Sequence, residues 1–135
     1  MGNAGNKGTV LVMDDQEMLR EVAAAMLEDM GYRVLTAENG EQAVSTYRRA
    51  LLDGESIQLL ILDLTVPGGM GGAECARRIR QLDSGARMLV CSGHAADAIL
   101  AQYPDHGFCG AISKPYVFED LARAVDAALD FPVSG

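Results

Sequence analysis

Five short apolar runs alternate with five segments of helical periodicity along the chain of 135 residues. The apolar runs are typical of strands, and the helical segments repeat their apolar residues at the i, i+3, i+4, i+7 spacing of an amphipathic helix. Gly31 follows the first helical segment, at the position where a glycine commonly ends a helix. The predicted strands are 9–15, 32–37, 57–63, 87–93 and 110–116, and the predicted helices are 19–30, 39–52, 71–82, 95–103 and 117–129.

This alternation predicts one α/β domain, with a single doubly wound, five-stranded parallel sheet and helices on both faces. The length suits one domain with one core, which we place at residues 7–130. Residues 1–6 are expected to form a flexible leader or linker, and residues 131–135 a tail. In such sheets, ligands bind outside the carboxyl ends of the strands, so the residues at those ends are the candidates for function.

The composition narrows the class of protein. A net charge of −8 argues against direct binding to nucleic acid, which needs a basic surface. No apolar run approaches the roughly 18 residues that span a bilayer, so no membrane insertion of this segment is expected. The three cysteines fit no zinc-binding spacing, and we expect them to be buried free thiols of a cytoplasmic protein.

Charged and hydroxyl side chains follow four of the five predicted strands. The first strand ends on Asp14 and Asp15, the third on Asp63, the fourth on Ser92 and the fifth on Lys114. Two like charges about 4 Å apart repel by roughly 4 kcal/mol at an effective dielectric near 20, so three carboxylates at one edge need a cation. Oxygen ligands favour a hard ion such as Mg²⁺, and a carboxylate beside it can attack phosphorus.

Together these residues resemble the receiver domain of response regulators in two-component signalling, over residues 7–130. The resemblance rests on the acidic pair 14–15, Asp63 with Pro67 after it, Ser92-Gly93 and Lys114-Pro115. The fold that it implies has the flavodoxin-like sheet order 2-1-3-4-5. The glycine-rich turn 67–72 and the sequence that follows the fourth strand resemble the receivers of hybrid sensor kinases in particular.

The resemblance implies that Asp63 accepts a phosphoryl group from a partner phosphohistidine. The partner is then a histidine kinase or a histidine phosphotransfer domain, in the same polypeptide or in a separate one. Ser92 is the implied switch hydroxyl, and Lys114 the implied phosphate-binding cation. Such a domain is not a turnover enzyme, but it phosphorylates and dephosphorylates itself in the presence of Mg²⁺.

The resemblance also implies a metal site. Asp14 and Asp15 would hold Mg²⁺, with Asp63 and the backbone carbonyl of Thr65 as further ligands, and Mn²⁺ can substitute for it. One position departs from the family pattern. Ala111 stands where the family often has a tyrosine or phenylalanine that turns inward on phosphorylation, so the usual aromatic switch is in doubt.

Two other functions compete with this interpretation. A degenerate receiver would act only as an interaction module, although the complete set of site residues argues against it. The sequence 63–66 faintly resembles the nucleophile motif of haloacid-dehalogenase-type phosphatases. In those enzymes the nucleophile precedes the acidic metal pair, and here that order is reversed.

The first predicted helix carries an apolar stripe that is wider than one core face requires. Receivers of the resembled family dock at this helix onto the helix pair that bears the donor histidine. We expect Leu19 and Ala23 to form the docking edge, and Val22, Met26 and Leu27 to face the sheet. The alternative is that the whole stripe belongs to the core.

Overall fold

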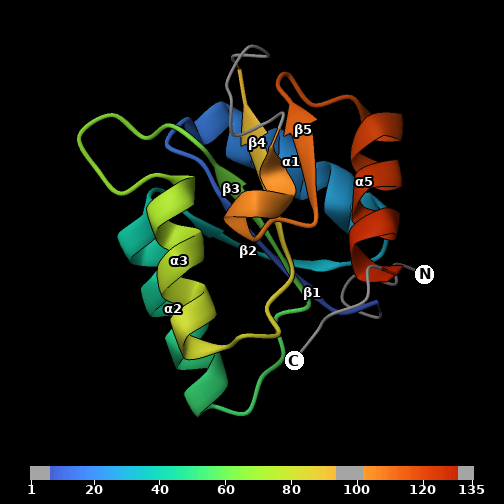
Figure 1. Ribbon diagram of the computed structural model, residues 1–135. Coiled ribbons are helices and arrows are strands. Elements are labelled where there is room, and N and C mark those ends of the chain that lie inside the picture. The colour runs from blue at the N-terminus through green and yellow to red at the C-terminus, as the bar shows by residue number, and fades with distance from the viewer. Residues whose placement is uncertain (1–6, 94–101, 131–135) are drawn as a thin grey trace.

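The computed structural model describes residues 7–93 and 102–130. Five parallel strands form one sheet in the order β2-β1-β3-β4-β5 (Figure 1). The strands are β1 (Thr9–Met13), β2 (Arg33–Ala37), β3 (Leu59–Asp63), β4 (Met88–Ser92) and β5 (Gly110–Ser113). The sheet and its strand order confirm the predicted fold class.

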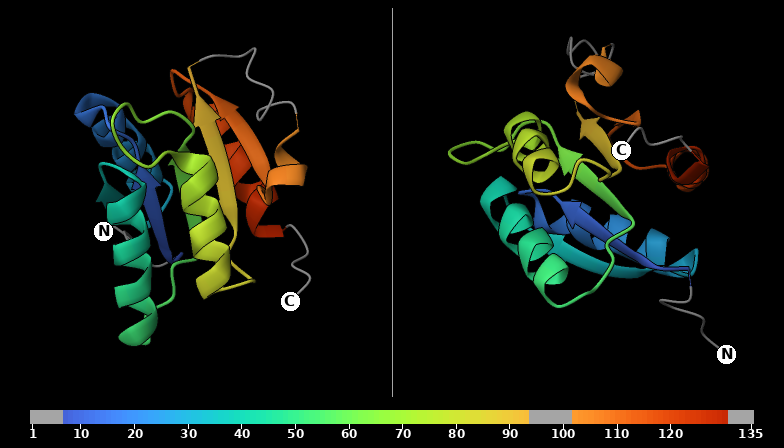
Figure 2. Two further views of the ribbon diagram at one scale, coloured as in Figure 1. Left: turned by 60° about the vertical axis from the view of Figure 1, so that its left-hand side comes forward. Right: turned by 60° about the horizontal axis from the view of Figure 1, so that its bottom comes forward.

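Helices cover both faces of the sheet (Figure 2). One face packs against α1 (Glu17–Asp29) and α5 (Phe118–Asp130), and the other against α2 (Gly40–Leu52) and α3 (Gly72–Leu82). A short 3₁₀-helix, η1 (Tyr103–His106), precedes β5. The predicted helix 95–103 falls mainly on residues 94–101, which lie outside the described residues, as do the predicted leader 1–6 and tail 131–135.

The two central strands are buried from end to end. Every residue of β3 and of β4 is buried, as expected for strands that are covered on both faces. Side chains along β3 alternate between the two apolar clusters: Leu59 and Ile61 face α1 and α5, whereas Leu60 and Leu62 face α2 and α3. By this alternation Asp63 continues the row on the α1 and α5 side.

The phase of α1 differs from the prediction. Ala23 is fully buried together with Leu27, whereas Val22 is 37% exposed and Met18 is 75% exposed. The assignment of Ala23 to a docking edge and of Val22 to the core was therefore wrong. Because apolar residues occupy most of the helix circumference, their pattern does not fix which stripe faces the sheet.

The cysteines are free among the described residues. Cys75 and Cys91 are buried, and Cys109 is partly buried. Burial raises the pKa of both the Cys75 and the Cys91 thiol to about 12, so both stay protonated at neutral pH. No helix within residues 7–93 and 102–130 has the length and apolar character required to cross a membrane.

Candidate functional site

Four polar side chains meet where β1, β3, β4 and β5 end. Asp14 follows β1, Asp63 is the last residue of β3, Ser92 is the last residue of β4, and Lys114 follows β5. Asp14, Asp63 and Ser92 are the buried polar residues of the described chain. The parallel sheet places all of these residues at its carboxyl edge, where ligands bind in folds of this class.

Lys114 bridges the two buried carboxylates. Its Nζ lies 3.0 Å from Asp14 Oδ2 and 3.1 Å from Asp63 Oδ1. Burial lowers the pKa of Lys114, but the hydrogen bond to Asp14 and the negative charge of Asp63 raise it by more, so the net pKa is above its ordinary value. The lysine is therefore a fixed positive charge between two carboxylates.

Asp63 is incompletely neutralised by this lysine. Its pKa is raised from 3.8 to about 6, first by burial and then by the negative charge of Asp14, against the lowering effect of Lys114. Asp63 Oδ2 is buried and has no hydrogen-bond partner among residues 7–93 and 102–130. A buried acceptor without a partner typically costs about 1–3 kcal/mol, so this oxygen marks a place where a cation or a reacting group belongs.

The turn after β1 is fixed by contacts that the sequence analysis did not identify. Asp14 Oδ1 accepts a hydrogen bond of 2.9 Å from the backbone N–H of Gln16, and the Asp14 carbonyl accepts one of 2.7 Å from Arg20 Nη1. Gln16 is the residue directly before α1. The sequence spacing of Asp14 and Arg20 does not predict their contact, because a loop and one helical turn separate the two residues.

A cavity of about 420 Å³ opens at this edge of the sheet. Asp15 and Thr65 lie at its exposed rim, while Asp63, Ser92 and Lys114 contribute from within. Its lining residues are Asp15, Gln16, Leu19, Asp63, Thr65, Pro67, Ser92, Gly93, Lys114 and Pro115. The cavity thus brings together the predicted residues, except for Asp14, which is buried behind it.

The donor set fits a hard cation. Asp14 and Asp63 offer carboxylate oxygens that lie within 4.8 Å of each other. Asp15 and Thr65, both of which contain oxygen atoms, line the rim of the same cavity. Oxygen-rich sites of this kind bind Mg²⁺ through one or two carboxylates and several waters. Asp63 Oδ2, which has no hydrogen-bond partner within residues 7–93 and 102–130, supplies one such oxygen.

Glycines shape the turn that leaves Asp63. Gly68 has a φ of 75°, a left-handed conformation that glycine adopts without strain. A Cβ atom on Gly72 would lie 2.8 Å from the Asp63 carbonyl oxygen, and one on Gly71 would clash with the carbonyl oxygen of Leu64. The structure requires glycine at both positions, because α3 begins directly against the backbone of the site.

Two further residues form the buried wall behind the carboxylates. Cys91 Sγ lies within 4.8 Å of carboxylate oxygens of Asp14 and Asp63. Its thiol is 3.1 Å from the hydroxyl of Tyr116, and both side chains are buried. The sequence analysis expected Cys91 to be a buried free thiol and did not identify Tyr116. Ala111 lies apart from this wall and packs against the cluster on the α2 and α3 side.

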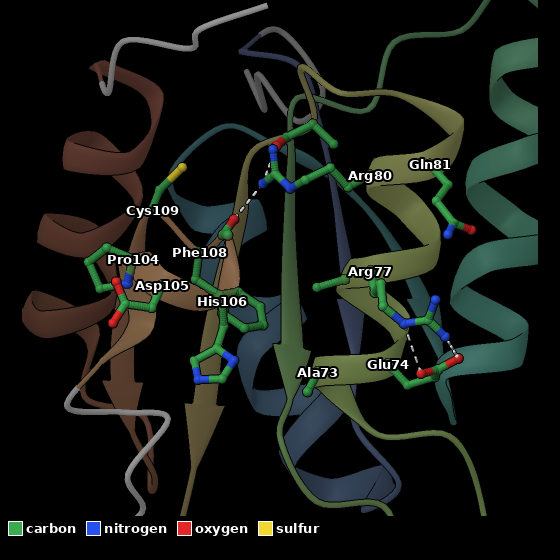
Figure 3. Close-up of a pocket in the computed structure, with 13 residues that line it drawn as sticks. Ala73, Glu74, Arg77, Arg80, Gln81, Pro104, Asp105, His106, Phe108 and Cys109 are labelled. Carbon is green, nitrogen blue, oxygen red and sulfur yellow. Dashed lines mark hydrogen bonds and ion pairs between the residues drawn. The ribbon is translucent and has the colours of Figure 1, made fainter.

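A larger cavity, of about 850 Å³, lies between α3 and the η1 segment (Figure 3). Its two arginines already have partners. Arg77 pairs with Glu74, and Arg80 donates to the backbone carbonyls of Ser84, Ala86 and Gly107. The lining contains no group of carboxylates comparable to that at the strand ends. The smaller cavity, not the larger one, therefore holds the candidate chemistry.

Comparison with known proteins gives one consistent result. The profile described as "Response regulator receiver domain" matches residues 10–126. The response regulator receiver protein Anae109_2439 of Anaeromyxobacter is 34% identical over 105 residues, which cover 78% of this chain and 42% of that protein. The chemotaxis protein CheY of Bacillus subtilis is 29% identical over 122 residues, or 90% of this chain and 97% of CheY.

Other matches include a kinase and a solved complex. The sensor histidine kinase AruS of Pseudomonas aeruginosa is 33% identical over 136 residues, which cover 90% of this chain but 13% of the kinase. A chain of the CheX–CheY–BeF₃–Mg²⁺ complex from Borrelia burgdorferi superposes with a TM-score of 0.78 at 25% identity, covering 87% of this chain and 85% of that one. The chain thus spans under half of Anae109_2439 and a small part of AruS.

Proposed function

The chain belongs to the response regulator receiver domain family of two-component signalling, and we propose that Asp63 accepts a phosphoryl group from a phosphohistidine of a partner. The observation that carries this proposal is the state of Asp63. It is buried at the end of the central strand, it is only partly neutralised, and its Oδ2 lacks a partner among the described residues while the residue borders an open cavity.

Mg²⁺ is the proposed cofactor, with Mn²⁺ as a substitute. Asp14, Asp15, Asp63 and the backbone carbonyl of Thr65 would hold it. When bound, the ion neutralises negative charge on the carboxylates and on the phosphoryl oxygens. The CheY complex from Borrelia burgdorferi contains Mg²⁺ with BeF₃, which supports a divalent cation in receivers of this fold.

The proposed reaction is a phosphoryl transfer. Asp63 Oδ2 attacks the phosphorus atom, a bond forms between oxygen and phosphorus, and the bond between phosphorus and the imidazole nitrogen of the donor breaks. The electron pair of that bond leaves with the imidazole, which then takes up a proton. The ammonium of Lys114, already 3.1 Å from the other oxygen of Asp63, would turn toward a phosphoryl oxygen and stabilise its charge.

Ser92 is proposed to couple phosphorylation of Asp63 to a conformational change in the rest of the domain. It ends β4 and is buried beside the cavity, so its hydroxyl can reorient toward a new phosphoryl oxygen. Ala111 has no side chain that could follow this movement as an aromatic ring would. The conformational switch of this receiver is therefore proposed to depend on Ser92 and on the backbone of β4 and β5.

The domain is proposed to act stoichiometrically, not as a turnover enzyme. Small phosphodonors would phosphorylate it in the presence of Mg²⁺, and water would later attack the phosphorus atom, releasing phosphate and restoring the Asp63 carboxylate. A receiver without acceptor activity would instead be an interaction module. The residues at the edge of this sheet favour the acceptor, because a binding module has no need to keep two buried carboxylates in contact with one lysine.

The partner is proposed to be a histidine kinase or a histidine phosphotransfer domain, in the same polypeptide or a separate one. Similarity to a segment of the sensor histidine kinase AruS supports such a pathway. The corrected docking surface consists of Met18 and Val22, which are exposed on one face of α1, and of Leu19, which lines the cavity. We place this pathway in the cytoplasm, without direct contact to nucleic acid or insertion into a membrane.

Intact-mass spectrometry after incubation with acetyl phosphate and Mg²⁺ tests the acceptor assignment. The wild-type chain should gain one phosphoryl adduct, and the Asp63→Asn chain none. Asp53→Asn serves as the control, because Asp53 caps the far end of α2 and is exposed. Labelling of Asp63→Asn would contradict the assignment, and absence of labelling in the wild type would favour the interaction module.

A further inference from the structure

Cys91 forms the inner wall of the carboxylate cluster. It pairs in register with Asp63 across the central strands, and its side chain is fully buried. The sulfur atom and one carboxylate oxygen from each of Asp14 and Asp63 lie within 4.8 Å of one another. A substitution at Cys91 therefore changes the packing directly behind Asp63, the proposed phosphoacceptor.

Tyr116 reaches the same wall from the connection between β5 and α5. Its hydroxyl lies 3.1 Å from Cys91 Sγ, and either atom can donate. Tyr116 is buried in the apolar cluster on the α1 and α5 side, and burial raises the pKa of its phenol. Since a buried hydroxyl without a partner is costly, this hydrogen bond determines where the end of the Tyr116 ring lies.

Only Pro115 separates Tyr116 from Lys114. Proline restricts its own backbone angle φ, and two residues span at most about 7 Å, so an anchored Tyr116 restrains the backbone of Lys114. The backbone N–H of Lys114 also donates to the carbonyl of Ser92 at 2.9 Å. Two contacts thus connect Lys114 to β4. The first is its own backbone hydrogen bond, and the second is the hydrogen bond between Tyr116 and Cys91.

We propose that Cys91 and Tyr116 are positioning residues, which hold the Lys114 ammonium against Asp63 for phosphoryl transfer. This inference rests on the proposed function of Asp63. The hydrogen bond between the two side chains fixes the connection after β5, and the position of that connection sets the distance from the Lys114 ammonium to the reacting oxygens. Neither residue touches the phosphoryl group, and both act through Lys114.

The test is the rate of Asp63 labelling by acetyl phosphate at saturating Mg²⁺ in Tyr116→Phe and Cys91→Ala. Each variant removes one side of the hydrogen bond, and each should label about fivefold more slowly than the wild type. The double variant should be no slower than Tyr116→Phe alone, because both changes remove the same contact. Cys91→Ser retains a hydroxyl that can pair with Tyr116 and should recover most of the rate.

Matched controls separate positioning from general loss of packing. Tyr32 is buried in the same apolar cluster but precedes β2 at the opposite edge of the sheet, and Cys75 is fully buried on α3. Tyr32→Phe and Cys75→Ala should label at the wild-type rate. If Tyr116→Phe labels as fast as Tyr32→Phe, or if the effects of Tyr116→Phe and Cys91→Ala multiply in the double variant, the positioning role is wrong.

A second measurement does not depend on phosphorylation. The ¹⁵N resonance of the Lys114 ammonium reports its ion pairs directly. It should shift in Tyr116→Phe and Cys91→Ala, and stay in place in Tyr32→Phe and Cys75→Ala. A wild-type chain that takes no label would refute the proposed function, while an unchanged Lys114 resonance in Tyr116→Phe would refute the positioning role, so the two failures are distinguishable.

Discussion

Lys114 Nζ lies 3.1 Å from Asp63 Oδ1, although Lys114 follows β5 and Asp63 ends β3. The same ammonium contacts Asp14 at 3.0 Å, so one positive charge serves two buried carboxylates. This shared lysine explains how the edge of a core sheet tolerates a carboxylate that is otherwise too costly to bury. Two ionised carboxylates and one ammonium together carry one net negative charge, which is available to bind a metal ion or to take part in a phosphoryl reaction.

The first prediction concerns removal of this lysine. Lys114→Met should destabilise the metal-free protein by about 3–5 kcal/mol, because it leaves two buried carboxylates facing each other without a cation. Urea unfolding in EDTA measures the change, and Lys7→Met, at an exposed lysine, is the control. Stability equal to that of the wild type would show that the two carboxylates do not repel each other in the folded state.

The residues of this cluster were predictable because each follows an apolar strand. In a parallel sheet that pattern alone places Asp14, Asp63, Ser92 and Lys114 at one edge, whatever the details of packing. The contact between Cys91 and Tyr116 was not predictable, because nothing in their sequence spacing pairs them. Such a contact depends on the register between β4 and the segment after β5, which only the folded chain fixes.

The phase of α1 shows a second limit. A helix with apolar residues at most positions is compatible with two orientations against the sheet. The prediction placed Val22 in the core and Ala23 at the surface, and the structure shows the reverse. In the folded chain the small Ala23 is fully buried in the cluster against the sheet, whereas Val22 lies at the surface. The glycines at 71 and 72 show the opposite case, since a glycine-rich turn was visible in the sequence while the backbone contacts that require both were not.

The second prediction concerns Mg²⁺. The ion should stabilise the wild-type chain, by about 1.4 kcal/mol when its concentration is ten times the dissociation constant, because it relieves the repulsion among the carboxylates. Asp15→Asn should reduce this gain, since Asp15 contributes an oxygen at the rim of the cavity. Thermal unfolding with and without Mg²⁺ measures both values, with Asp53→Asn as the control. A melting temperature that millimolar Mg²⁺ does not change would contradict the metal site.

The third prediction is the pH dependence of stability in EDTA. The pKa of Asp63 is raised from 3.8 to about 6 by burial and by Asp14. Between these values the folded chain holds a proton that the unfolded chain releases, so this group loses its stabilising effect as the pH rises through 6. Two pKa units correspond to about 3 kcal/mol. Asp63→Asn, which does not ionise, should therefore become more stable relative to the wild type between pH 4.5 and pH 7.5.

The measurement is the difference in free energy of unfolding between Asp63→Asn and the wild type, from urea titrations at both ends of that range. Carboxylates outside the cluster around Asp63 titrate equally in both chains and cancel in the difference. A difference that stays constant across this range would mean that Asp63 ionises normally in the fold. Addition of Mg²⁺ should shrink the difference at the higher pH, because the ion stabilises the ionised carboxylate.

The last prediction concerns the docking surface on α1. Met18 and Val22 are one helical turn apart and exposed, so they lie on the same side of the helix, and Leu19 beside them lines the cavity at Asp63. A partner helix that covers the exposed parts of Met18 and Val22, 75% and 37% of the two residues, would gain about 1.5–3 kcal/mol. Val22→Arg should therefore slow transfer from a phosphorylated histidine phosphotransfer domain about tenfold or more, while labelling by acetyl phosphate and thermal stability stay at wild-type values.

Leu52→Arg is the matched control, because Leu52 is exposed at the far end of α2. Equal loss of rate with both phosphodonors would place Val22 in the reaction site, and no loss with either would place the docking surface elsewhere on the domain.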